Sequence, residues 1–191
     1  MCTTPHNPNN VDLSRDVLFY LTTPEKSKLD VERTDKNVWP SLNVAINILE
    51  KIKEKATGIL GDQNIINDQL IRLKALRCWF MTQRNIAAWI FGVYGYINTN
   101  NNSVKKEKIN LVRDMINKEI KNSEELISLL NSDVEFIALT DKGETPLVYG
   151  DNLKELLKVR IELMKEHIND EPAIDPNYIE KKAGEIINSF I

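Results

Sequence analysis

The hydrophobic pattern of the chain is strongest between residues 65 and 97, a stretch without proline. In its first half an apolar residue recurs every three or four positions, which is typical of an amphipathic helix; these residues are Ile66, Leu70, Leu73, Leu76 and Phe80. The second half, residues 86–97, has no charged residue and contains four aromatic side chains. A helix that is apolar on all sides must be covered by neighbours. We therefore predict a long central helix at about 65–97 with other helices packed around it.

Helical spacing also predicts amphipathic helices elsewhere in the chain. They are expected at 12–21, from Trp39-Pro40 to Gly58 or Gly61, from Ser103 onwards, from Asp151 or Asn152 to Ile168, and from Asp175-Pro176 to Phe190. Mostly polar residues fill 22–39, where we expect a connection or a partly helical loop. After Ser103 two interpretations stay open, because a new helix at Asn122 and one helix continuing to Leu130 both fit the apolar spacing.

Residues 134–149 do not have helical spacing. Two β-prone runs flank a turn-like segment with Gly143, which favours a small β-hairpin, while a capping box at Ser132 favours a short helix and a loop. The predicted fold is therefore all-α, an irregular helical bundle of five to seven helices around the long central helix, with a hairpin at 134–149 as the one candidate for strand. Residues 1–11 are expected to be a flexible polar lead, and 12–191 a single helical domain.

Composition narrows the class of protein. A net charge of −3 with basic residues spread along the chain argues against nucleic-acid binding. Residues 82–85 interrupt the central apolar run and leave about twelve apolar positions, fewer than the ~20 that span a bilayer, so no membrane-spanning segment is expected. The chain thus resembles an ordinary soluble protein in composition. A cell-envelope lipoprotein acylated at Cys2 is the alternative.

Candidate catalytic groups are few. His167 stands near a helix end, and the carboxylates three and four positions later, Asp170 and Glu171, fall in the turn beyond that helix, so no metal or cofactor is expected. Glu162 and Glu166 alternate with Arg160 and Lys165, which is typical of a solvated face. Cys78 lies in the apolar central helix and is interpreted as a buried structural thiol. The sequence therefore favours a chain without catalytic activity.

One polar cluster interrupts the central helix at Gln83 and Arg84, and Arg77 lies two turns earlier on the side of Arg84. An arginine on a largely buried helix needs a carboxylate or carbonyl partner. We expect Arg84 to be mostly buried and paired with an acidic side chain of another helix. The alternative is a cleft for an anionic or hydroxyl-rich ligand, with six candidate ligand-binding residues: Arg77, Gln83, Arg84, Trp79, Trp89 and Tyr149.

The run GETPLVYGDNLKELLKVRIELMKEHINDEPAIDP, residues 143–176, is similar to helical segments that accompany large bacterial carbohydrate-processing enzymes, but it has no signature motif and assigns no residue a role. Two hypotheses follow from the whole sequence. The first is a non-catalytic accessory or interaction domain that acts through its surface, with a protein partner or self-association. The second, which the resemblance favours, is a small-molecule or glycan-binding helical domain within a larger carbohydrate-processing protein.

Overall fold

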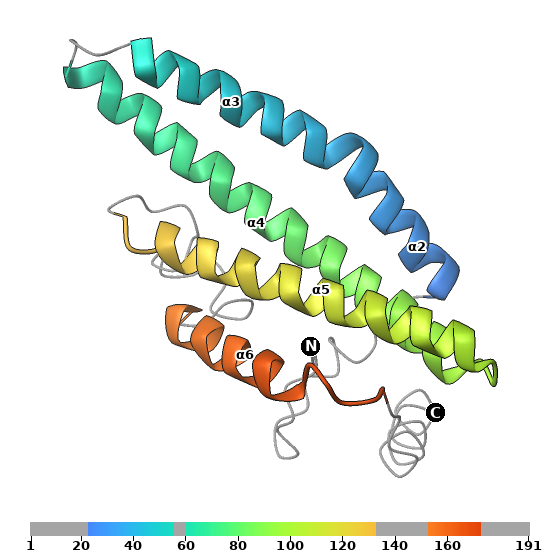
Figure 1. Ribbon diagram of the computed structural model, residues 1–191. Coiled ribbons are helices and arrows are strands. Elements are labelled where there is room, and N and C mark those ends of the chain that lie inside the picture. Colours follow the sequence, from blue (N-terminus) through green and yellow to red (C-terminus); the bar gives the residue numbers. More distant parts are fainter. Residues whose placement is uncertain (1–22, 56–59, 133–152, 173–191) are drawn as a thin grey trace, which may run out of the picture.

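The computed structural model describes residues 23–55, 60–132 and 153–172. Those residues form an all-α bundle of four helices and contain no strand, as the hydrophobic spacing predicts (Figure 1). The first helix is bent and continuous from residue 24 to residue 55; its parts are α2 (Pro24–Arg33), a π-helical turn η1 (Thr34–Val38) and α3 (Trp39–Lys55). The other three are α4 (Leu60–Ile97), α5 (Asn102–Leu129) and α6 (Leu153–His167).

The predicted number of helices, five to seven, is too high for the described part of the chain. Residues 22–39 were expected to be mostly loop, but from residue 24 they are helical and continue into α3. Residues 102–129 form one helix, so Asn122 does not start a new one. The polar lead 1–11, the helices at 12–21 and 176–190, and the hairpin at 134–149 lie outside the described residues.

The first helix begins earlier than predicted because Thr23 and Pro24 form a start signal. The Thr23 Oγ1 accepts a hydrogen bond from the backbone N–H of Lys26 at 3.2 Å. Pro24 occupies the first turn, where its missing N–H is not needed, and Glu25 follows in the same turn, where its negative charge is favourable. Together these residues make a helix N-terminus that hydrophobic spacing alone does not reveal.

Pro40 was interpreted as a helix start, yet it lies inside the first helix, directly after the π-helical turn. Here the N–H of Trp39 donates to the carbonyl of Thr34, five residues earlier. Proline cannot make the usual helical hydrogen bond and crowds the preceding turn, and a widened turn accommodates it. The extra residue also rotates α2 by about 100° relative to an unbroken α-helix. Ser27 of α2 and Ile46 of α3 are consequently both buried.

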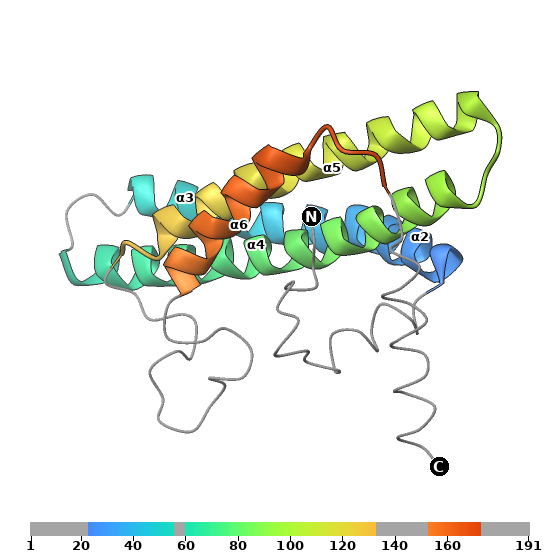
Figure 2. The same ribbon diagram turned by 90° about the horizontal axis from the view of Figure 1, so that it is seen from below.

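The long helix α4 is central, as predicted, and extends five residues further toward its N-terminus than the predicted 65–97. It packs against α2 and α3 on one side and α5 on another, while α6 packs on α5. Figures 1 and 2 show α3 and α6 on opposite sides of the α4–α5 pair. Gly61 does not end the preceding helix, because it lies in the first turn of α4.

Near the turn that joins them, α4 and α5 approach closely at two glycines. A Cβ atom added at Gly92 would lie 2.6 Å from Val112 Cγ2, and one added at Gly95 would lie 2.9 Å from Lys108 Cδ. Glycine is therefore required at position 92, where the neighbour is a stiff branched side chain, more than at position 95, where a flexible lysine faces it. Asn101, and not the predicted Ser103, caps α5.

The hydrophobic core lies between α4, α5 and α6. Its buried residues are Ala88, Val93, Val112, Met115, Ile116, Ile120, Ile161 and Met164. The amphipathic helix predicted to end at Ile168 is confirmed as α6, and four apolar residues on one of its sides are buried: Leu153, Leu157, Ile161 and Met164. Within the described ranges, no helix combines the length and apolar character needed to cross a bilayer.

Candidate functional site

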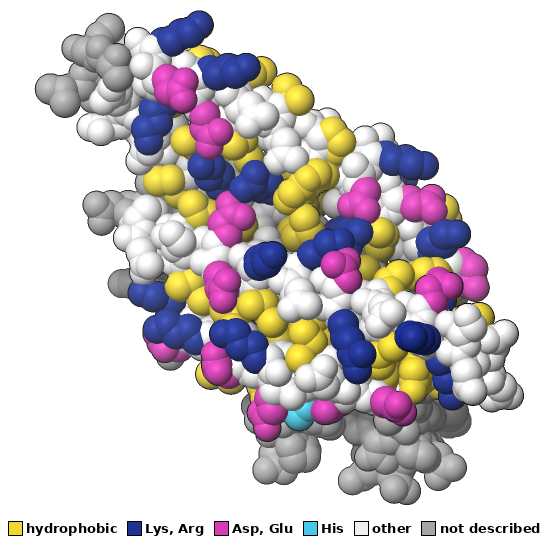
Figure 3. Space-filling model, in the orientation of Figure 1, with side chains coloured by type: hydrophobic (Ala, Val, Ile, Leu, Met, Phe, Trp, Pro, Cys, Tyr) yellow, Lys and Arg dark blue, Asp and Glu magenta, His cyan; other side chains and the backbone are white. Residues whose placement is uncertain are grey.

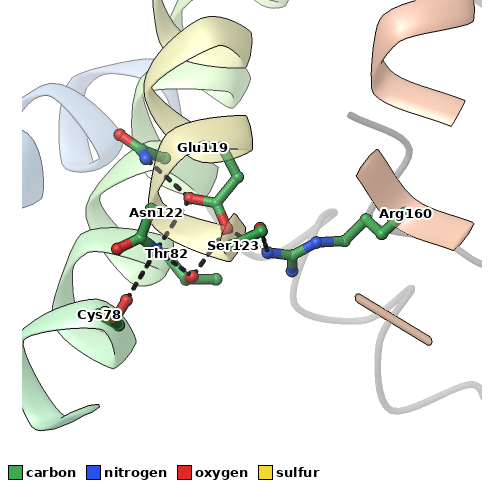
Figure 4. A network of polar contacts seen from close by, with 7 residues as sticks. Cys78, Thr82, Glu119, Asn122, Ser123 and Arg160 are labelled. Atoms are coloured by element: carbon green, nitrogen blue, oxygen red, sulfur yellow. Dashed lines mark hydrogen bonds and ion pairs between the residues drawn. The ribbon is translucent and has the colours of Figure 1, made fainter. Parts of the chain in front are cut away.

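A buried polar network joins α4, α5 and α6 around the carboxylate of Glu119 (Figure 4). Glu119 lies on the inward face of α5, one turn after the core residue Met115, and its side chain is 0% exposed. Asn122 and Ser123 follow on the same face and are also buried. The sequence does contain a signal for this site, because Glu119 continues the apolar stripe of α5 at helical spacing, but the prediction did not single it out.

Both carboxylate oxygens of Glu119 accept hydrogen bonds from α4. Thr82 Oγ1 donates to Oε1 at 2.7 Å, and Asn85 Nδ2 donates to Oε2 at 2.7 Å. Asn122 Nδ2 reaches Oε2 at 3.4 Å and the backbone carbonyl of Cys78 at 2.9 Å. A buried charge requires such partners, because removal from water costs several kcal/mol per ion.

Arg160 brings α6 into the network. Its Nη2 forms an ion pair with Glu119 Oε1 and donates to Ser123 Oγ at 2.7 Å. The arginine side chain is 29% exposed, so the cation borders on solvent while the carboxylate does not. The interpretation of Arg160 as part of a solvated face was therefore wrong. Arg160 lies three positions after Leu157 and four before Met164, which are both buried, so it shares their side of α6.

Arg84 is mostly buried and paired, as expected from its place in the central helix. Its Nε and Nη2 donate to the two carboxylate oxygens of Asp35 in the π-helical turn, at 3.0 and 2.9 Å. The Arg84 side chain is 15% exposed and that of Asp35 is 47% exposed. Arg84 Nη1 also donates to Asn85 Oδ1 at 3.3 Å, which links this ion pair to the Glu119 network.

The other candidate ligand-binding residues do not meet at one place. Arg77 Nη2 pairs with Glu125 at 2.6 Å, Nη1 donates to Asn43, and the guanidinium lies over the ring of Trp39. Trp89 packs against the core. Gln83 and Trp79 are exposed on the outer face of α4, and Tyr149 lies outside the described residues. Both arginines are thus engaged by neighbouring helices.

A hollow of about 380 Å³ lies on the outer face of the first helix, away from the Glu119 network. All its lining residues belong to that one helix; they are Lys26, Leu29, Asp30, Glu32, Arg33 and Lys36. A ligand pocket is usually formed by several elements with converging polar groups. Among the described residues, no group of three His, Cys, Asp or Glu side chains is arranged to hold a metal ion.

Cys78 is fully buried, as predicted for a structural thiol. Burial, helped by the nearby Glu125 carboxylate, raises the pKa of the Cys78 thiol to about 12. Because the thiolate is the nucleophilic form, this cysteine is unreactive near neutral pH. His167 is exposed at the end of α6, and its Nδ1 lies 2.7 Å from Asp170 Oδ2.

Comparison of the chain with protein-family models, with curated proteins and with solved structures gives no significant match. What the chain does must therefore be inferred from its own residues.

Proposed function

We propose that this chain is a non-catalytic helical accessory module that binds another protein through its surface. The observation that carries this proposal is an exposed apolar row on α3, formed by Val44, Ile48 and Ile52. These side chains are between 44% and 58% exposed and recur at every fourth position, so they share one side of the helix. Single exposed apolar residues are common, whereas apolar side chains that are exposed next to one another can mark a protein-binding site.

The buried network supports the same proposal. Glu119 is 0% exposed and accepts hydrogen bonds from donors of three helices, so within the described part of the chain its carboxylate is engaged by the bundle itself. Arg77 and Arg84 are paired with carboxylates of neighbouring helices. These polar groups hold the helices in register, which leaves the outer surface to make contacts with other molecules.

A second apolar row lies on α6, where Leu156, Val159 and Leu163 are about half exposed. In sequence, α6 stands between residues 133–152 and 173–191, which lie outside the described part. The row on α3 is therefore the better-defined surface for a test.

The test compares partners of the intact chain with those of an Ile48→Glu variant. Proteins that associate with each form are cross-linked in cells that express it and are then quantified by mass spectrometry. Lys121→Glu on the exposed side of α5 is the control for an added negative charge. We expect Ile48→Glu to lose partners that Lys121→Glu keeps. Identical partners for all three forms would contradict the proposal.

Glycan binding is the second candidate, and one observation favours it. Trp79 is 43% exposed on α4, and Gln83 is exposed one turn later on the same face. An exposed aromatic ring beside an amide is an arrangement that can stack on a sugar and bind its hydroxyl groups. Quenching of tryptophan fluorescence by a panel of oligosaccharides tests this candidate, and the quenching should disappear in a Trp79→Ala variant. Signals that persist in Trp79→Ala would exclude this surface.

A further inference from the structure

The apolar row on α3 lies beside positive charge. Val44, Ile48 and Ile52 extend over about two helical turns, or ~12 Å. Figure 3 shows hydrophobic side chains along the outer edge of α3. Lys51 and Lys55 follow Ile48 and Ile52 by three positions, so their side chains stand next to the row.

Neither of these lysines is neutralised within the described part of the chain. Both Lys51 and Lys55 are exposed, and no ion pair involves them there. Two other charged residues of this helix segment contact α4. Lys53 donates to Asn67 of α4 at 2.7 Å, and Glu50 pairs with Lys74 of α4 at 2.8 Å. Charges on the inner side of α3 thus serve the bundle, whereas those beside the row are available to a partner.

On the basis of the proposed function, we propose that the segment that binds this row is an amphipathic helix of a partner protein whose apolar seam is bordered by Asp or Glu. A helix matches a straight, narrow row, because its own apolar stripe has the same width and repeat. Acidic residues at its edge would pair with Lys51 and Lys55, as charges flanking a helix–helix seam do. A second copy of α3 would bring its own Lys51 and Lys55 beside the same row.

The inference can be tested with three helical peptides of about 20 residues, long enough to cover the row. The first has a leucine seam bordered by Glu, the second has the same seam bordered by Lys, and the third has the Glu border with serines in the seam. Binding to the full chain is measured by fluorescence anisotropy at low and high salt. We expect the Glu-bordered peptide to bind about tenfold more tightly than the Lys-bordered one at low salt, and the difference to shrink at ~1 M salt. The serine peptide should not bind.

Variants of the chain identify the surface. A Lys51→Glu/Lys55→Glu double variant should reverse the order of the two leucine peptides. Ile48→Glu should abolish binding of both, and the control Lys121→Glu should leave both unchanged. Circular dichroism of each variant confirms that helix content is retained, which is expected because all these positions are exposed.

Each contrary result has a distinct meaning. Equal binding of both leucine peptides would overturn the acidic border but keep the row as a protein-binding surface. Self-association seen by sedimentation and lost in Ile48→Glu would assign the row to a second copy, and binding only to vesicles containing phosphatidylserine would assign it to a membrane. If no probe binds while Ile48→Glu still loses its cross-linked partners, the partner class is wrong and the proposed function stands. If neither effect is seen, both proposals fail.

Discussion

Replacing Arg160 with methionine tests whether the Glu119 network holds the bundle together. Methionine keeps most of the volume and the packing of the side-chain stem but removes the cation. Glu119 would then remain 0% exposed with its charge, stabilised only by Thr82, Asn85 and Asn122. Breaking a buried ion pair typically costs 3–5 kcal/mol. Because three donors remain and Arg160 is partly exposed, we expect a loss near the lower end, about 3 kcal/mol of the free energy of unfolding.

A second substitution, Glu119→Gln, makes the test specific, because its effect on the free energy of unfolding should change sign when Arg160 is replaced. In the natural chain, Glu119→Gln loses the ion pair and should destabilise by about 1–3 kcal/mol. In the Arg160→Met background it removes a stranded charge and should instead stabilise by about 1–2 kcal/mol. Lys158→Met is the matched control, since Lys158 lies on the same helix in an exposed pair with Glu155. Its effect should stay within about ±0.5 kcal/mol.

The free energies are obtained from urea denaturation followed by circular dichroism, with linear extrapolation. A loss of 3 kcal/mol is large against the ~5–15 kcal/mol typical of a domain, and it is easily resolved. Two results would refute the reasoning: an effect of Arg160→Met no larger than that of the Lys158→Met control, or a destabilisation by Glu119→Gln that is the same in both backgrounds. Either result would mean that the Glu119 carboxylate does not depend on α6.

Three further predictions follow from single positions. Gly92→Ala should destabilise the chain by about 1–3 kcal/mol in urea denaturation, through overpacking. Gly95→Ala, facing a flexible lysine, should change stability little or raise it by up to ~1 kcal/mol, and equal effects at both sites would contradict this reasoning. In a Cys2→Ser variant, Cys78 should resist iodoacetamide in the folded chain until the pH rises well above 9.0, as mass spectrometry at each pH would show. The contribution of the protonated Cys78 thiol to stability should be complete below pH 9.0 and lost toward pH 12, as urea denaturation at each pH would show. Arg84→Ala should cost about 1–2 kcal/mol by thermal or urea unfolding, less than a fully buried pair, because its partner is half exposed; a loss of 4 kcal/mol or more would indicate a deeper role.

The all-α fold and the helices α4 to α6 could be predicted because each has a sustained apolar stripe. Burial in a bundle requires such a stripe, and the α6 residues Leu157 and Ile161 show it clearly. The first helix was missed in part because Pro40 looks like a start signal. In the structure the π-helical turn before Pro40 accommodates the proline inside one continuous helix, and both α2 and α3 pack on α4.

The buried network around Glu119 illustrates a second limit of prediction from the sequence. Glu119 and Arg160 lie on different helices, so the place of Glu119 in the apolar stripe of α5 indicates that it is buried but does not identify Arg160 as its partner. Arg84 was correctly expected to find an acidic partner, since its helix is apolar around it, but the choice of Asp35 depends on the π-helical turn that presents it. Burial predicts that a partner must exist, whereas only the three-dimensional packing selects which residue it is.

The partners of the Glu119 carboxylate come from three helices, and this has a consequence for the order of folding. Three of its donors, Thr82, Asn85 and Asn122, belong to the α4–α5 hairpin, and the short turn at 98–101 brings these two helices together early, because local contacts form fastest. The hairpin can therefore collapse with the carboxylate already held by neutral donors. We expect Arg160 to join the network afterwards, when α6 packs on α5. On unfolding this order is reversed, so α6 is the segment expected to detach first. Hydrogen exchange should proceed in α6 through partial opening while the amides of α4 and α5 are still protected.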